Sequence, residues 1–186
     1  QAEDELGRLG KYRVLSIIGR GGMGVVYKAE DPFAKRFVAL KAILPSLGAS
    51  EDIRKRFMRE AVSMAQLEHE HIVRLYEVNE DRNIPFMAME YLVGWPLDRH
   101  LENVGRVSIA ECVRIGREIA EGLAIAHERG LMHRDIKPAN LWIESPNARV
   151  KILDFGLARV NSVLPADGAT VLGAQPSRSR HGHCEL

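Results

Sequence analysis

The sequence has few cysteines, no long apolar run and no excess of charge of either sign. Its 186 residues include only two cysteines, Cys112 and Cys184, which is too few for a disulfide framework and is typical of a reducing, cytoplasmic setting. No stretch approaches the ~18 uninterrupted apolar residues of a membrane helix, so we expect no membrane segment. Lysine and arginine total 26 against 25 acidic residues, and the net charge of +1 gives no basic field for nucleic acid.

What remains is the composition of a globular protein with mixed secondary structure. Hydrophobic residues make up 46% and charged residues 27% of the chain, which excludes the collagen-like and disordered classes. Between two groups of β-rich runs, apolar residues recur at helical spacing and predict a helix that begins after Ser50. Its expected apolar face consists of Phe57, Ala61, Met64 and Leu67. The β-rich runs predict strands at 12–19, 24–30, 36–43, 72–79 and 86–92.

The second half is dominated by one long amphipathic segment. Ser108 and Glu111 form a capping box that predicts the start of a helix, and Gly130 predicts its end. Cys112 is expected to be a small buried residue of this helix. The expected apolar stripe consists of Ile109, Val113, Gly116, Ala120, Leu123 and His127, with Cys112, Ile115 and Ile119 beside it. With short strands expected at 141–143 and 150–153, the order of elements predicts an α+β fold in which a hinge at 90–96 joins a strand-rich lobe to a helix-rich lobe.

A glycine-rich segment joins the first two expected strands, with Gly19, Gly21 and Gly24 in a G-x-G-x-x-G-x-V pattern. Glycines let backbone N–H groups approach phosphate oxygens closely. The pattern alone fits either a phosphate-binding loop or an ordinary glycine-rich hairpin. A dinucleotide-binding fold is disfavoured, because there the third glycine opens a helix, whereas a second strand follows Gly24.

Further polar positions are candidates for chemistry. Lys41 ends an apolar strand and either points into water or meets an anion. Glu60 lies on the predicted helix and is either exposed to solvent or within reach of Lys41. The polar segment 133–140 directly follows the long helix, so its side chains are expected to converge. The carboxylate of Asp154 opens an Asp-Phe-Gly sequence at a strand end, which is a natural position for a metal ligand.

In order, spacing and context, these features resemble the signature of the protein kinases: a Gly-rich loop, a strand Lys, a helix Glu, H-R-D-x-K-P-x-N and D-F-G. The resemblance covers about residues 12–159 and is to the bacterial relatives of eukaryotic Ser/Thr kinases. Lys137, two residues after Asp135, indicates Ser/Thr rather than Tyr substrates. The family implies a two-lobe fold, with an extension at 1–11, a small ATP-binding lobe at 12–92 and a large lobe from residue 93.

By this resemblance, ATP and Mg²⁺ are the expected cofactors. The three glycines would cover the ATP phosphates. Lys41, with Glu60 as its ion-pair partner, would contact the α- and β-phosphates. Asn140 and Asp154 would bind Mg²⁺, which prefers hard oxygen ligands.

The resemblance also implies the catalytic and base-binding residues. Asp135 would accept the proton of the substrate hydroxyl, and Lys137 would lie beside the γ-phosphate. Trp142 stands where an aliphatic residue is usual in the family, and it either stacks on the base or turns into the core. Thr170 is the expected activating phosphosite, paired with Arg134. The residues expected around adenine are Val26, Ala39, Met89, Glu90, Leu92 and Trp142.

The family pattern stops after Gly173. The segment 174–186 lacks the expected A-P-E motif and has little apolar content, so we expect a disordered, aberrant tail after an incomplete large lobe at 93–173. A shift of the reading frame or a truncation of the gene is the hypothesis that accounts for this. Two functions stay open: a Ser/Thr protein kinase that acts on protein substrates, and a non-catalytic ATP-binding or interaction fragment.

Overall fold

The computed structural model describes residues 5–21, 24–44 and 51–155. The larger of its two sheets has six antiparallel strands in the order β1-β2-β3-β4-β6-β5. All five strands expected in the first half form, and β1, inside the expected N-terminal extension, was not predicted. The strands are β1 (Gly7–Leu9), β2 (Tyr12–Gly21), β3 (Gly24–Asp31), β4 (Arg36–Ile43), β5 (Leu75–Asp81) and β6 (Ile84–Glu90).

A side-chain cap fixes the turn between β3 and β4. The Oδ1 atom of Asp31 accepts from the backbone N–H groups of Phe33 and Ala34, both at 3.0 Å, which stabilises the turn locally. The register that follows places Lys41 directly opposite Val26. Because opposite residues of an antiparallel pair share a face, two of the predicted site residues lie side by side.

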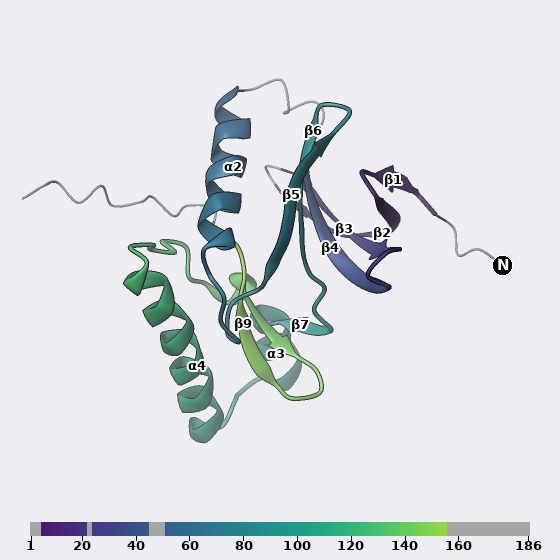
Figure 1. Cartoon of the computed structure of the whole chain (residues 1–186). Helices are drawn as coiled ribbons and strands as arrows, with labels where there is room; N and C mark the ends of the chain where they lie inside the picture. Colours follow the sequence, from purple (N-terminus) through teal and green to yellow (C-terminus); the bar gives the residue numbers. More distant parts are fainter. Residues whose placement is uncertain (1–4, 22–23, 45–50, 156–186) are drawn as a thin grey trace, which may run out of the picture.

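Helix α2 (Glu51–Ala65) stands on one side of the large sheet beside β5, far from β1 (Figure 1). Its Phe57, Ala61 and Met64 are buried, as the predicted apolar face requires, and Leu67 beyond the helix end is buried as well. The expected N-cap Ser50 lies outside the described residues. These side chains lie in one apolar core with residues from the second half of the chain. Burial of this face of α2 therefore stabilises the contact between the two halves.

Up to residue 155, where the described part ends, the second half contains a small sheet with the order β7-β8-β9 and two α-helices. The Oγ atom of Ser108 accepts from the backbone N–H of Glu111 at 3.1 Å, and Gly130 has a φ of 71°, so both predicted ends of the long helix are confirmed. Neither β7 nor α3 was predicted. The elements are β7 (Gly94–Pro96), α3 (Leu97–Val104), α4 (Ile109–Glu128), the 3₁₀ turn η1 (Pro138–Asn140), β8 (Leu141–Glu144) and β9 (Arg149–Ile152).

Helix α4 packs against β9 through only part of the predicted apolar side: Ile115 is buried and Leu123 packs against the core. Ile109 and Val113 are 85% and 65% exposed, and Cys112 is exposed as well, so the prediction that Cys112 is buried was wrong. The reason is a close approach at Gly122, where a Cβ would lie 3.2 Å from the carbonyl oxygen of His71. The buried residues of α4 are Ile115, Glu118, Gly122 and Ala126.

The chain crosses from one sheet to the other between β6 and β7, inside the predicted hinge. A second connection forms where β5 was expected to start: the backbone N–H of Val73 donates to the carbonyl of Ile152 at 3.0 Å, so β5 begins only at Leu75. The predicted two-part α+β arrangement is confirmed. Within the described ranges, every helix is too short or too polar to cross a membrane.

Candidate active site

A cleft with an empty volume of about 740 Å³ opens where the two parts of the chain meet. The predicted site residues that line it are Gly19, Val26, Ala39, Lys41, Met89, Glu90, Leu92, Trp142 and Asp154. Ile18, Val73, Tyr91 and Leu153 complete the lining and were not predicted.

The glycines of the β2–β3 hairpin differ in whether the surrounding packing leaves room for a side chain. Gly24 is required sterically, because a Cβ there would lie 2.1 Å from the carbonyl oxygen of Ala42 on β4. Gly21 pairs with Gly24 across the hairpin, yet a Cβ on Gly21 would meet nothing within 4 Å. Residues 22–23 between them lie outside the described part of the chain. Packing therefore explains Gly24 and leaves Gly21 unexplained.

Lys41 on β4 meets Asp154 across the cleft. The Lys41 Nζ atom lies 2.7 Å from Oδ1 of Asp154, and the lysine side chain is only 12% exposed. A largely buried ammonium needs a carboxylate close by, because loss of hydration penalises an unpaired charge. The partner predicted from the sequence, Glu60, lies in α2, but its side chain lies outside the described part of the structure.

Two side chains of the 133–140 loop converge on one carboxylate oxygen. The Lys137 Nζ atom lies 2.6 Å from Oδ2 of Asp135, and Asn140 donates from Nδ2 to the same oxygen at 2.9 Å. The hydrogen bond from Lys137, together with that from Asn140, outweighs the loss of hydration and lowers the pKa of Asp135 below its usual value. Asp135 is therefore an ionised carboxylate at neutral pH, held in orientation by two donors.

The loop is anchored to the strand end that precedes Asp154. His133 is buried, and its Nδ1 accepts from the backbone N–H of Asp135 at 3.3 Å. The proton is therefore on Nε2, which donates to the carbonyl of Leu153 at 2.7 Å. In return, the backbone N–H of Leu153 donates to the carbonyl of Asn140 at 2.9 Å. These contacts hold the carboxylates of Asp135 and Asp154 in a fixed relation.

Asn140 and Asp154 have the donor chemistry that suits Mg²⁺. A carboxylate and an amide oxygen are hard ligands, and Mg²⁺ commonly uses one or two carboxylates together with phosphates and waters. Asp154 has a φ of 48°, a strained conformation that recurs at ligand-binding sites. No group of three or more His, Cys, Asp or Glu suited to a metal occurs within the described ranges. Phosphate oxygens and waters would therefore complete the coordination.

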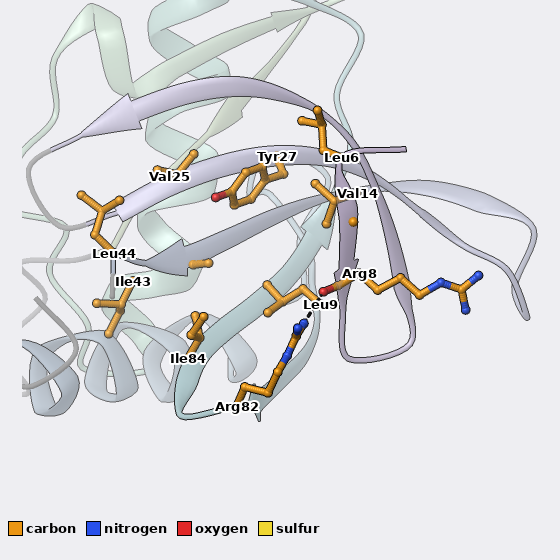
Figure 2. Close-up of a pocket in the computed structure, with 12 residues that line it drawn as sticks. Leu6, Arg8, Leu9, Val14, Val25, Tyr27, Ile43, Leu44, Arg82 and Ile84 are labelled. Carbon is orange, nitrogen blue, oxygen red and sulfur yellow. Dashed lines mark hydrogen bonds between the residues drawn. The ribbon is translucent and has the colours of Figure 1, made fainter. Parts of the chain in front are cut away.

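A second cavity lies among the strands β1 to β4 and the start of β6, away from these residues (Figure 2). It has an empty volume of about 780 Å³ and an apolar lining that includes Leu9, Val14 and Val25. Arg82 closes its lower edge by donating from Nη2 to the carbonyl of Arg8 at 2.6 Å, while the Arg8 side chain points away (Figure 2). None of the predicted site residues lines this cavity, so the cleft between the two parts is the candidate site.

Comparison with known proteins relates the chain to one family. The sequence matches the protein kinase domain family over residues 12–167. The probable serine/threonine-protein kinase pknA2 of Bifidobacterium longum is 40% identical over 156 residues, which are 82% of this chain and 20% of that protein. The serine/threonine-protein kinase PrkC of Bacillus subtilis is 35% identical over 178 residues, which are 93% of this chain and 27% of that protein.

The same likeness extends to the fold. The crystal structure of the kinase domain of PknI from Mycobacterium tuberculosis matches with a TM-score of 0.68 at 31% identity, over 82% of this chain and 62% of that chain. The chain thus spans about a quarter or less of these two curated relatives and under two thirds of the PknI structure. Every predicted site residue from Gly19 to Asp154 lies inside the matched range. By sequence and by fold, the chain belongs to the protein kinase family.

Proposed function

We propose that the chain acts as a Ser/Thr protein kinase, which transfers the γ-phosphoryl group of ATP to a serine or threonine hydroxyl of a protein. Two pairs of charged groups carry this proposal: one lines the cleft, and the other lies in the loop that His133 anchors to Leu153 of the cleft lining. Asp135 is held by Lys137, and Asp154 is paired with Lys41 at 2.7 Å. Catalysis of phosphoryl transfer depends on positioning and on neutralising phosphate charge, which two lysines and a cation-binding carboxylate supply.

In the proposed reaction, the substrate hydroxyl oxygen attacks the γ-phosphorus and the bond from phosphorus to the ADP oxygen breaks. The hydroxyl proton passes to Asp135, whose lowered pKa keeps it ionised before the reaction. Lys137 would stabilise the transferring phosphoryl group, and Lys41 would hold the α- and β-phosphates. Mg²⁺, bound through Asn140 and Asp154, would neutralise charge on the phosphates.

The nucleotide would occupy the cleft with its base toward the hinge. Trp142 lines the cleft, and its Nε1 atom is buried, 3.0 Å from the position a Cβ on Gly94 would take. We infer that the indole forms the floor on which adenine stacks, a contact worth about 1–3 kcal/mol. Glu60 would join Lys41 in its ion pair. The other residues expected around the nucleotide are Gly19, Gly21, Gly24, Val26, Ala39, Met89, Glu90 and Leu92.

Protein substrates and a cytoplasmic location complete the proposal. The relatives named above are Ser/Thr protein kinases, which supports hydroxyl groups of proteins as acceptors. The chain has two cysteines, and Cys112 is a free thiol, which supports a reducing compartment.

A second candidate function is that of an ATP-binding module that transfers no phosphate. The exposed apolar side of α4 favours it, since Ile109 and Val113 are 85% and 65% exposed. Such a patch is typical of a surface that contacts a partner. The rigid support that catalysis needs would then depend on that partner.

Phosphate transfer from labelled ATP with Mg²⁺, to the chain itself and to a generic basic protein, tests the proposal. Asp135→Asn is expected to lower the rate by about 10²–10⁴-fold while ATP binding is kept. Asp52→Asn, at an exposed position in the first turn of α2, is the matched control and should leave the rate unchanged. Undiminished transfer by Asp135→Asn would contradict the proposed role. ATP binding without any transfer by the unmodified chain would favour the second candidate.

A further inference from the structure

An ion pair beside the cleft links the two parts of the chain. Lys151 lies on β9, directly opposite Trp142 on β8, and its Nζ atom lies 2.8 Å from Oε2 of Glu90 at the end of β6. The lysine side chain is 8% exposed and the glutamate side chain 25% exposed. Lys151 does not line the cleft and was not among the predicted site residues. Its ammonium nevertheless forms an ion pair with Glu90, which does line the cleft.

Glu90 is held through both its backbone and its side chain. Its backbone N–H donates to the carbonyl of Arg74 at 2.9 Å. Its Oε2 atom accepts from the backbone N–H of Arg74 at 3.3 Å and receives the Lys151 ammonium as well. These three contacts fix Glu90 where the chain leaves the sheet and enters the hinge.

Backbone hydrogen bonds tie the same strand β9 to the segment before β5. The backbone N–H of Ile152 donates to the carbonyl of His71 at 2.8 Å, and the N–H of Val73 donates to the carbonyl of Ile152 at 3.0 Å. The ion pair adds a side-chain link from the neighbouring residue of β9 to the hinge. The proposed floor of the base site, on β8, is therefore held at a fixed position relative to Glu90.

We propose that Lys151 is a positioning residue for the nucleotide base: through Glu90 it fixes the hinge so that the backbone at 90–92 faces the edge of adenine. This inference rests on the proposed function, because it states how the same cleft selects its nucleotide. Adenine presents an amino donor and a ring-nitrogen acceptor on that edge, whereas guanine presents a carbonyl and an N–H at the same places. A fixed hinge therefore favours ATP over GTP, and a hinge released from Lys151 discriminates less.

Isothermal titration calorimetry of the full chain tests the inference by measuring its affinities for Mg-ATP and for Mg-GTP. Lys151→Met should weaken ATP binding by about 5- to 10-fold, the equivalent of one hydrogen bond, and should leave GTP binding nearly unchanged. Lys151→Arg keeps a cation at this position and should restore most of the preference for ATP. Lys55→Met is the matched control, because Lys55 forms an exposed ion pair with Glu51 on α2 and should leave both affinities unchanged.

Glu90→Gln provides a milder test, since the amide keeps the shape and the acceptor of the carboxylate. It should reduce the preference for ATP by about 2- to 4-fold, because a neutral acceptor binds an ammonium less strongly. A lower melting temperature with an unchanged ratio of ATP to GTP affinity, in both Lys151→Met and Glu90→Gln, would overturn the inference and leave the proposed function intact. Failure of the unmodified chain to bind Mg-ATP would overturn the proposed function itself, and the inference with it.

Discussion

Glu77 on β5 is a carboxylate whose charge is strongly favoured by the fold. Burial alone would raise its pKa, but contacts from Lys11 at 2.7 Å, Asn79 at 2.9 Å and the Tyr12 hydroxyl at 2.7 Å outweigh burial and lower the pKa to about 2. Burial, followed by the bond to Glu77, raises the pKa of Tyr12 to about 12. The pair links β2 to β5, which are not neighbours in the sheet.

The linkage of this carboxylate to folding predicts a specific acid sensitivity. Because the folded-state pKa lies below the ordinary value of 4.5, the stabilisation is complete above pH 4.5 and is lost as the pH falls toward 2. Glu77→Gln should lower the free energy of unfolding at neutral pH by about 1–3 kcal/mol. In urea unfolding across the acid range, the difference in free energy of unfolding between Glu77→Gln and the unmodified chain should shrink below pH 4.5. A gap that stays constant with pH, or one equalled by the exposed variant Glu102→Gln, would contradict this account.

Sequence spacing found the groups of the site that lie close together along the chain, and missed contacts between distant ones. The polar residues of the 133–140 loop could be predicted as a group, because one short loop holds them. The pair of Lys41 with Asp154 and the pair of Lys151 with Glu90 join residues 113 and 61 positions apart. Only the packing of the two parts brings such residues within hydrogen-bond distance, so no local pattern indicates their pairing.

The β2–β3 hairpin depends on one of its glycines far more than on the other. Gly24→Ala would place a Cβ against the backbone carbonyl of Ala42, and backbone cannot move aside as a flexible side chain can. The substitution should lower the free energy of unfolding by about 1–3 kcal/mol, the usual range for overpacking. Gly21→Ala, the matched control in the same hairpin, has open space around its Cβ and should change stability by no more than about 0.5 kcal/mol. Equal losses for both variants in denaturant unfolding would show that β3 and β4 are not packed as described.

Helix α4 shows where periodicity misleads at the level of an element. Its apolar residues occur on more than one side, so the stripe through Ile109 and Val113 was as good a pattern as the stripe through Ile115. The face that packs is decided by partners elsewhere in the chain. The Glu118 carboxylate accepts from the backbone N–H of Val150 at 2.8 Å, and Gly122 allows the close approach of neighbouring backbone. Short elements such as β7, with three residues, leave no periodic pattern at all.

The two-part arrangement of the molecule could be predicted, because strand-rich segments precede the long helical segment in the sequence. How the parts meet could not. They share one apolar core, in which Phe57 and Met64 of α2 lie with Ile152 and Phe155 from the second half. The cleft lies beside this shared core and takes lining residues from both parts. Any ligand that fills it therefore contacts, and should stabilise, the whole described fold.

Thermal unfolding with and without Mg-ATP measures that stabilisation. At an ATP concentration of about 100 times the dissociation constant, binding to the folded state adds about 2.7 kcal/mol. For a chain of this size, that corresponds to a rise in melting temperature of about 5–10 °C. Lys41→Met should abolish most of the rise because it removes the proposed phosphate contact, whereas Lys55→Met, at an exposed position on α2, should preserve it. An equal rise in Lys41→Met would show that nucleotide binds elsewhere. The absence of any rise in the unmodified chain would show that the cleft does not bind ATP.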